Sequence, residues 1–583
     1  EKSLLVERIN SAHPYEVMPP KDSGLKLSEA ERELLHKWIQ SGAEFDQHWA
    51  FVSPQAPDVP AARDSDWVNN PIDNFVLKKL EANGLQPSPE ADRYTLVRRV
   101  YLDLIGLPPS IEEADKFVNS TDPDAYEKLV EQLLNSPQYG ERWARHWLDL
   151  ARYADTNGYE KDRERSIWPY RDWVIKALND DIPFDQFTIE QLAGDMLPAP
   201  TTDQLVATGF HRNTMLNEEG GIDPLEYRFH SMVDRVATTG TVWLGMTTGC
   251  AQCHTHKYDP ITHTDYYAMF GLLNNADEPD LILPDVEIQK RRTHTQHEIE
   301  KLEAALPSQF PPMEGEGTTE ELRAKNLGQQ FHEWLKAQFA NARDWKSVAP
   351  VKMSTNLPRL EVLADNSIFS TGDITKRDVF NLEFDLSQIE QPITALRLEV
   401  LPDDRLPARG PGRAFYEGRK GDFFLSELTA RIADEEILFG ESSNSFGKIS
   451  IGNGNADAAN VLDRDGSTGW STATREGESH QLVLNFKEPL AAEFPLEIEL
   501  LFERHFAASL GRFRFSFTSN NETTVASPLP VEVEVQLASV GIKELSDEIR
   551  NELTRHFLQL TPQLAEARKP IEALKKQLAE FPT

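Results

Sequence analysis

The sequence predicts a multidomain α+β protein in which an all-α domain precedes an antiparallel β-sandwich held between helical segments. The length of 583 residues exceeds what one hydrophobic core supports, so about three domains are expected. Helical periodicity with Pro, Gly and Asn breaks fills residues 69–284, whereas apolar and polar residues alternate in short runs over 347–542. These two patterns predict the order of the domains.

Short helices around a loop are predicted for residues 1–48. Met18 precedes two prolines, which break the chain because proline lacks an N–H and disfavours helix just before it. Ser28, with Glu31 three residues later, forms a capping box at the start of the next helix. Residues 49–68 are rich in Pro and Ala and are expected to be a linker.

The all-α domain is predicted over residues 69–284 from apolar residues at helical spacing. Helices are expected at residues 72–80, 96–104, 125–134, 141–153, 170–179 and 225–244. Breaks such as GLPP at 106–109 separate them, because proline and glycine end helices.

An antiparallel β-sandwich is predicted over residues 347–542. Its clearest alternating runs are 395–400 (ALRLEV), 481–486 (QLVLNF) and 512–517 (RFRFSF). Alternation with turn residues between the runs is typical of strands with one face in a core. Charged helical stretches at 285–346 and 543–583 flank it, so the sandwich is expected to be inserted in an antiparallel helical stalk.

Composition and charge exclude several classes of function. Lys and Arg total 60 and Asp and Glu total 95, which gives a net charge of −35. Such a surface repels phosphate backbones and argues against nucleic-acid binding. No apolar run approaches the roughly 20 residues of a membrane span. The chain begins at Glu1 without Met or signal peptide, so a processed form or a piece of a longer polypeptide is expected.

The only two cysteines stand together in a Cys-x-x-Cys-His motif, which is the attachment signal of c-type haem. In that arrangement Cys250 and Cys253 add across the vinyl groups of one porphyrin, and His254 binds the iron. Two alternatives stay open. One is a zinc site completed by His256 and His263, and the other is a dithiol with a redox or structural role.

The motif does not supply a sixth ligand for the iron. His211 and His146 are the candidates, because their aromatic neighbours in the sequence suggest burial. For each, an ordinary core or surface residue is the alternative. The sixth position can also be open, which permits peroxide or small-ligand chemistry.

Two further segments, 149–163 and 217–235, are dense in charged and aromatic residues. Carboxylates in a glycine-bearing loop can act as acid and base or bind a cation. The candidate catalytic residues are Asp155, Glu218, Glu219 and Asp223. The alternative is a solvated loop with ion pairs at helix ends.

The sandwich contains a distinctive run at 459–470, ANVLDRDGSTGW. Its Asp-x-Asp-Gly offers oxygens for a turn or for Ca²⁺, and Trp470 could stack on a sugar face. A structural turn with a core tryptophan is the alternative.

Many segments in one order carry a resemblance to a known family. They are 39–43 (IQSGA), 48–51 (HWAF), 147–155 (WLDLARYAD), 190–195 (EQLAGD), 217–221 (NEEGG), 234–236 (DRV), 249–260 (GCAQCHTHKYDP), 397–402 (RLEVLP), 410–413 (GPGR) and 511–514 (GRFR). Together they resemble the planctomycete cytochrome c proteins, which combine a small cytochrome domain with an all-α domain and a second domain, both of unknown function.

The resemblance implies an exported protein with covalent haem and a part in electron transfer. Residues 1–48 look like the C-terminal half of the family's small cytochrome domain, and Met18 matches the distal methionine of that domain's haem. Residues 459–470 also resemble the discoidin, or galactose-binding, class of sandwich. The end of the chain looks like the start of another family domain, so further domains of a longer parent polypeptide are expected.

These observations predict a periplasmic or otherwise extracytoplasmic c-type cytochrome. One haem in the 69–284 domain exchanges electrons with a redox partner, which the acidic charge predicts to be basic. The sandwich docks on a glycan or a partner subunit. The alternatives are a haem-dependent oxidoreductase acting on a carbohydrate or other small substrate, and a structural surface protein.

Overall fold

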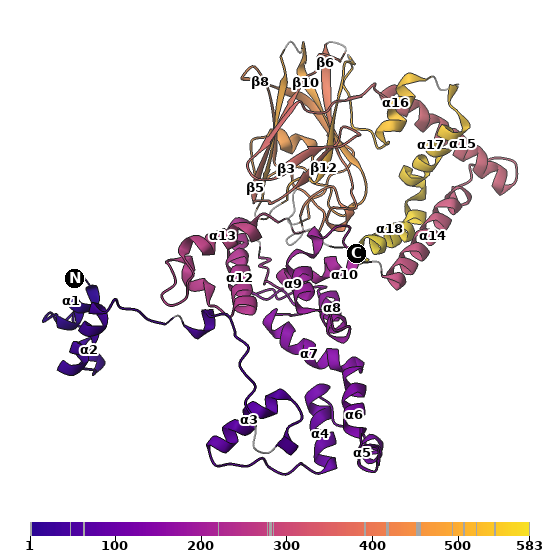
Figure 1. Ribbon diagram of the computed structural model, residues 1–583. Helices are drawn as coiled ribbons and strands as arrows, with labels where there is room; N and C mark the ends of the chain where they lie inside the picture. Colours follow the sequence, from indigo (N-terminus) through magenta and orange to yellow (C-terminus); the bar gives the residue numbers. More distant parts are fainter. Residues whose placement is uncertain are drawn as a thin grey trace. The chain divides into compact units, whose positions relative to one another are not determined.

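Figure 1 shows helices in the first half of the chain and two antiparallel sheets in the later part, which confirms the multidomain α+β fold. This computed structural model describes residues 3–46, 48–61, 65–219, 221–276, 278, 281, 283, 285–389, 392–414, 419–450, 456–491, 494–504, 506, 508–520, 522–540 and 544–581. The chain divides into two compact units, Glu1–Leu96 and Val97–Thr583. Within the described ranges, no helix combines the length and the apolar character needed to cross a bilayer.

Short helices joined by extended segments make up the unit Glu1–Leu96. They are α1 (Leu4–Asn10), α2 (Glu29–Gln40), α3 (Pro71–Ala82), the start of α4 (Arg93–Leu104), and the 3₁₀ turns η1 (Lys21–Ser23), η2 (Trp49–Phe51) and η3 (Ser65–Trp67). The predicted capping box is confirmed. The Glu31 amide donates to Ser28 Oγ at 3.3 Å, and the Ser28 amide donates to Glu31 Oε2 at 2.7 Å.

Helices continue to residue 274 in the second unit. They are α5 (Ile111–Val118), α6 (Ala125–Leu134), α7 (Pro137–Leu150), α8 (Trp168–Asn179), α9 (Phe184–Ala193), α10 (Thr202–Ala207), α11 (Gly209–Arg212), α12 (Pro224–Leu244) and α13 (His263–Asn274), with the 3₁₀ turns η4 (Gly194–Met196) and η5 (Thr248–Gln252). The helix expected at 141–153 starts earlier, because Ser136 caps it ahead of Pro137. It ends at Leu150, and Arg152 then takes a positive φ of 58°.

A buried aromatic cluster holds α7, α8 and α9 together. Tyr170, Trp173 and Phe187 are each at most 5 % exposed. The Trp147 indole N–H and the Tyr170 hydroxyl both donate to Gln191 Oε1, each at 2.7 Å. This polar centre is satisfied, so it fixes the mutual position of the three helices.

Two antiparallel sheets form the sandwich. Their strands are β1 (Lys346–Ser347), β2 (Lys352–Thr355), β3 (Arg359–Val362), β4 (Ile368–Thr371), β5 (Arg377–Phe384), β6 (Ile393–Val400), β7 (Glu427–Ile432), β8 (Glu435–Ile437), β9 (Phe439–Asn444), β10 (His480–Leu490), β11 (Leu496–Glu503) and β12 (Arg512–Thr518), with the 3₁₀ turns η6 (Pro407–Arg409) and η7 (Ala458–Leu462). One sheet has the order β3-β4-β12-β6-β10-β9, with β1 also paired to β12, and the other β2-β5-β11-β7-β8. The alternating runs are strands, as expected, and Phe513, Phe515 and Phe517 alternate along β12 and are all fully buried. The expectation of one buried face is wrong for the runs in β6 and β10, where the residues between the apolar ones are buried as well.

The helices that flank the sandwich pack together as the predicted stalk. They are α14 (Val286–Gln309), α15 (Thr319–Asn341), α16 (Val531–Ser539), α17 (Asp547–Leu560), η9 (Pro562–Leu564) and α18 (Ala565–Glu580). One hydrophobic core contains residues that precede the sandwich in the sequence, such as Leu306 and Leu335, and residues that follow it, such as Phe557. α14 and α18 lie side by side in Figure 1 and are in contact.

Helix α16 lies inside the range expected to be sandwich, 347–542. Its sequence VEVEVQ alternates, yet the segment is helical because Val533 and Leu537, four residues apart, are buried in the stalk core. Glu534 points the other way and accepts from Arg397 Nη1 of β6 at 2.9 Å. The helix is therefore held between the stalk core and the sheet.

Candidate functional site

The Cys-x-x-Cys-His motif lies on the turn η5, which is anchored to α12 and α13. Thr248 Oγ1 donates to the Val236 carbonyl at 3.2 Å, and Ala251 is fully buried beside Val236. A Cβ on Gly240 would overlap the Thr248 side chain, so glycine is required for this close approach. The turn is thus fixed by small residues while its other side chains face outward.

The two thiols and the histidine of the motif are accessible. Cys250 and Cys253 are free cysteines and both are exposed. His254 is also exposed, and its Nδ1 lies 2.7 Å from the Thr255 carbonyl oxygen. Because a carbonyl oxygen can only accept, Nδ1 carries the proton and Nε2 keeps its lone pair. These residues therefore fit a covalent haem, which needs two reactive thiols and an imidazole nitrogen free for iron.

The histidines of the zinc alternative are engaged differently. His256 Nδ1 accepts from the amides of Tyr258 at 3.2 Å and Asp259 at 2.8 Å, so its proton resides on Nε2. His263 Nδ1 lies 3.0 Å from the Ala251 carbonyl oxygen. In the part of the chain that the structure describes, no three His, Cys, Asp or Glu side chains are grouped as they would be around a metal ion.

The two charged segments of the sequence analysis meet in space. Arg152 forms an ion pair with Asp234, Lys161 Nζ donates to the Glu218 carbonyl at 2.8 Å, and the Leu216 amide donates to the Asn157 carbonyl at 3.2 Å. Residues 149–163 and 217–235 therefore form one site beside α11.

The four candidate carboxylates have different roles in the structure. Glu218 is 15 % exposed and lies 3.9 Å from Arg163 Nε, so it belongs to the joined site. Asp155 is exposed and accepts from the Tyr153 hydroxyl at 2.5 Å. Burial and this carboxylate raise the pKa of Tyr153 to about 12.

The other two candidate carboxylates lie on the loop before α12. Asp223 caps that helix by accepting from the Leu225 amide at 2.9 Å. The Glu219 amide donates to Asn217 Oδ1 at 2.9 Å, which holds the loop. Gly220, between them, lies outside the described residues. Asp223 therefore acts as a helix cap, and a catalytic role for it stays a prediction.

The two candidate sixth ligands lie in different surroundings. His211 packs edge-on against Phe210, and both of its ring nitrogens are buried without a partner among the residues described. Burial, and then the charges of Arg235 and Arg152, lower the pKa of His211 to about 4. His146 is exposed on α7, 5.6 Å from the ring of Trp143. Iron ligation by either stays a prediction.

A half-buried carboxylate that the sequence did not reveal completes the joined site. Glu278 accepts from Arg235 at 2.5 and 3.0 Å and from Arg212 Nη1 at 3.3 Å, and it lies 3.8 Å from Arg228. Burial raises the pKa of Glu278, but these arginines outweigh it and hold the pKa below its ordinary value. No local pattern marks Glu278, because its partners lie about 40 to 70 residues earlier.

In the sandwich, the run at 459–470 forms a structured turn. Trp470 is fully buried and its indole N–H donates to the Phe446 carbonyl at 2.8 Å, so it cannot stack on a sugar. Asp463 accepts from the Asp465 amide at 2.9 Å and from Thr468 Oγ1 at 2.7 Å. Burial raises the pKa of Glu427, and the charge of Asp463 raises it further.

Comparison with known proteins gives a match to one family model. No curated protein and no solved structure is similar enough to this chain to be matched. Residues 71–278, about a third of the chain, match the family PSCyt2, described as a protein of unknown function (DUF1549). This region, which contains the Cys-x-x-Cys-His motif and the joined charged site, is therefore similar to a planctomycete cytochrome-associated domain.

Proposed function

We propose that this chain is an exported c-type cytochrome that carries one haem on Cys250 and Cys253, with His254 as iron ligand. The observation that carries the proposal is the pairing of two exposed thiols with a histidine whose Nε2 lone pair is free. The bound haem would supply one-electron exchange. The match of residues 71–278 to a cytochrome-associated family supports the same assignment.

The chain's own residues orient the ligand and leave it reachable. The Thr255 carbonyl fixes the His254 tautomer and the plane of its ring, as outer partners of metal-binding histidines do. The Tyr267 hydroxyl donates to the Gln252 carbonyl at 3.2 Å and places a partly exposed aromatic ring beside the motif. An exposed motif favours approach by a partner protein.

The test is expression with c-type maturation machinery, followed by a pyridine haemochrome spectrum and mass spectrometry. The expected result is one haem per chain, located on the peptide that contains Cys250. Cys250→Ala with Cys253→Ala should abolish the attachment. His254→Ala should alter the iron spectrum, whereas the matched control His256→Ala should leave it unchanged. A colourless chain with alkylatable thiols would contradict the proposal.

We further propose an extracytoplasmic location, on the basis of the resemblance to exported cytochromes. Fractionation of the native organism, with antibodies against the sandwich, tests it. The protein is expected in the periplasmic or surface fraction, and recovery only with cytoplasmic markers would contradict this.

A docking role for the sandwich and a Ca²⁺ site are also proposed. Ca²⁺ would lie beside Asp463 and Glu427, whose Oε1 is buried without a partner among the described residues. Added Ca²⁺ is expected to raise the Tm, and Asp463→Asn should remove this effect, whereas the exposed control Asp457→Asn should keep it. A Ca²⁺-independent Tm would contradict the site. Because Trp470 is buried, docking on a glycan would need other side chains.

A second candidate function is oxidation of a carbohydrate or other small substrate at the joined charged site. The observation in its favour is the set of buried, unpartnered polar atoms on Arg152 and His211, as judged from the described residues. Substrate-dependent reduction of the haem by an acidic sugar, lost on Arg152→Lys, is the expected result. If no acidic or neutral sugar reduces the haem, this second function is contradicted and electron transfer remains the proposed function.

A further inference from the structure

Buried donors without acceptors gather where residues 151–165 meet α11 and α12. Arg152 uses Nη1 for Asp234, but its Nε and Nη2 are buried and have no hydrogen-bond partner within the described part of the chain. These two N–H groups lie on one edge of the guanidinium plane. That edge is the one that donates two parallel hydrogen bonds to the oxygens of a carboxylate or a sulfate.

His211 lies in the same region, and both of its buried ring nitrogens lack a hydrogen-bond partner among the described residues. A neutral imidazole carries a hydrogen on one ring nitrogen and a lone pair on the other. An oxyanion can accept from the N–H, but the lone pair needs a hydroxyl. Arg152 pairs with Asp234, which accepts from Thr214 Oγ1 at 2.9 Å, and the Thr214 amide donates to the His211 carbonyl at 3.5 Å, so Arg152 and His211 belong to one network of contacts.

Positive charge is crowded around the two side chains, in a protein that is acidic overall. Arg165 gives its donors to the backbone carbonyls of Ala154, Arg212, Asn213 and Thr214 and, among the described residues, to no carboxylate. Burial, and then the charges of Arg212 and Arg152, lower the pKa of Arg165. Asp234 and Glu278 pair with Arg152 and Arg212, and a further anion would stabilise the remaining positive charge.

We propose that Arg152 and His211 form a binding site for an oxyanion that bears a neighbouring hydroxyl, the chemistry of a hexuronic acid or a sulfated sugar. Arg152 holds the oxyanion with its Nε–Nη2 edge, and His211 accepts from the hydroxyl. The site names a ligand class for the second candidate function, but binding does not require that function's redox step. Ordered water filling the same donors is the competing outcome.

Calorimetric titration of the full chain tests the site, with and without haem and at constant ionic strength. The probes are glucuronate and glucose 6-sulfate. Glucose lacks the oxyanion and acetate lacks the hydroxyl, so these are the matched controls. We expect at least one probe to bind tenfold or more tightly than both controls, and the better probe identifies the oxyanion. Binding no tighter than the controls overturns the proposal, whether or not haem is attached.

Variants then assign the site to these side chains. Arg152→Lys keeps the charge but loses the two-donor edge and should weaken binding at least tenfold, whereas Arg145→Lys, on the exposed face of α7, should not. His211→Asn should weaken glucuronate but leave acetate unchanged, a difference that a general loss of structure does not produce. Circular dichroism checks folding. If Arg152→Lys does not fold, the binding of glucuronate by His211→Asn tests the assignment instead. Folded variants that bind the probes as tightly as the unaltered chain overturn it.

Discussion

At the scale of single residues, the motif depends on which nitrogen of each histidine holds the proton. His254 donates from Nδ1 to a carbonyl, whereas His256, two residues later, accepts at Nδ1 from two amides. The two rings are therefore opposite tautomers: Nε2 of His254 has a lone pair, whereas Nε2 of His256 carries a hydrogen. The Asp259 carboxylate, 3.5 Å from His256 Nδ1, does not change this, because the amides already occupy the lone pair.

Buried neutral histidines predict a loss of stability in acid. The pKa of His480 is lowered to about 4 by burial, and then by the charge of Arg475. Its unfolded pKa is near 6.5, so below that value the unfolded chain binds more protons than the folded one. Stability is full above about pH 6.5 and falls as the pH drops toward 4.

His480→Gln tests this pH dependence. Urea unfolding at pH 7 and pH 5 should show that the variant loses less stability on acidification than the unaltered chain does, by about 2 kcal/mol. The exposed control His230→Gln should show the unaltered slope. Equal slopes for His480→Gln and the unaltered chain would contradict the burial effect.

At the scale of elements, buried and half-buried ion pairs join segments that are distant in the sequence. Arg397 of β6 is fully buried, stacks 4.4 Å from the ring of Trp345 and pairs with Glu534 of α16. The Trp345 indole N–H donates to the same carboxylate at 3.1 Å. Burial raises the pKa of Glu534, which the charge of Arg397 opposes. This contact attaches the stalk helix to the sheet.

Removing one partner of this pair should be costly. Glu534→Gln removes the nearer counter-charge of the buried Arg397 and leaves Glu399, 3.9 Å away, so the free energy of unfolding should fall by about 3 kcal/mol. Glu436→Gln, which breaks an exposed pair with Arg464, should cost no more than about 1 kcal/mol. Urea unfolding measures both, and similar small losses would show that α16 is not held by this pair.

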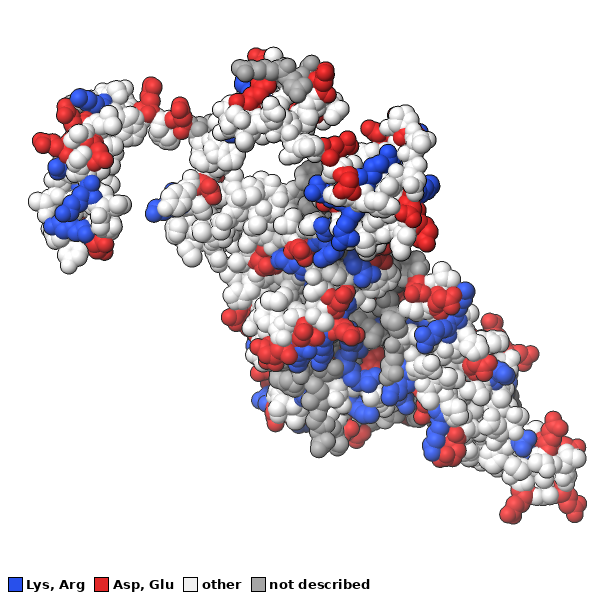
Figure 2. Space-filling model, turned by 90° about the horizontal axis from the view of Figure 1, so that it is seen from below, with Lys and Arg blue, Asp and Glu red and all other residues white. Residues whose placement is uncertain are grey.

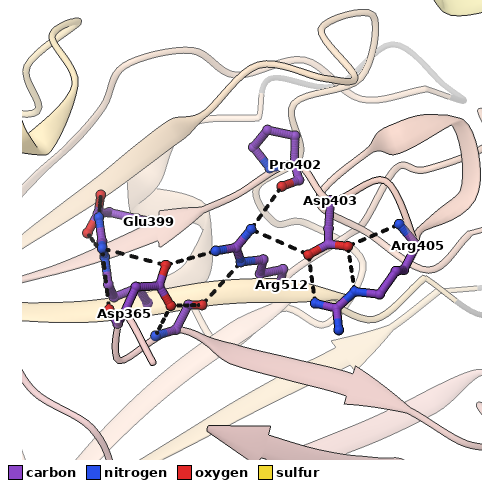
Figure 3. Close-up of polar contacts among 8 residues, drawn as sticks. Asp365, Glu399, Pro402, Asp403, Arg405 and Arg512 are labelled. Atoms are coloured by element: carbon purple, nitrogen blue, oxygen red, sulfur yellow. Dashed lines mark hydrogen bonds and ion pairs between the residues drawn. The ribbon is translucent and has the colours of Figure 1, made fainter. Parts of the chain in front are cut away.

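A second network ties two loops to β12 (Figure 3). Arg512 donates to Asp365 Oδ2 at 2.8 Å and to Ser367 Oγ at 3.1 Å, and it lies 3.4 Å from Asp403. Asp403 in turn accepts two hydrogen bonds from Arg405, at 2.8 and 2.9 Å. Arg512 is therefore the centre of the network, whereas Arg405 lies at its exposed edge.

Lysine substitutions distinguish these two positions. Arg512→Lys keeps the charge but loses the planar fork, so it should lower the free energy of unfolding by about 1–2 kcal/mol. Arg405→Lys, at a side chain that is 54 % exposed, should cost no more than about 1 kcal/mol. Thermal or urea unfolding of both variants gives the order, and the reverse order would contradict the central role of Arg512.

At the scale of the whole molecule, the net charge of −35 governs encounters at long range. Figure 2 shows basic and acidic side chains interspersed over the face that it presents. At distances larger than a local patch, the electrostatic potentials of all the charges add up, so the net negative charge still attracts a basic partner. Salt screens this attraction.

Electron exchange with a basic redox protein should therefore slow as salt is added. We expect the second-order rate constant, measured by stopped-flow absorbance of the haem-loaded chain, to fall about tenfold between 20 and 200 mM NaCl. An acidic redox protein serves as the control and should show no fall. A flat dependence with the basic partner would rule out electrostatic steering.

Local sequence determined much of this protein, because helix caps, period-two runs and a Cys-x-x-Cys-His spacing are set by neighbouring residues. Ser28 and Glu31 form their capping box, the Phe513 to Phe517 alternation forms a buried strand face, and the motif lies on one turn. Tertiary structure alone decided three things: that VEVEVQ becomes a helix, that Trp470 is buried, and that Glu278 meets three arginines. Each depends on partners far along the chain, whose packing and charge outweigh local preference.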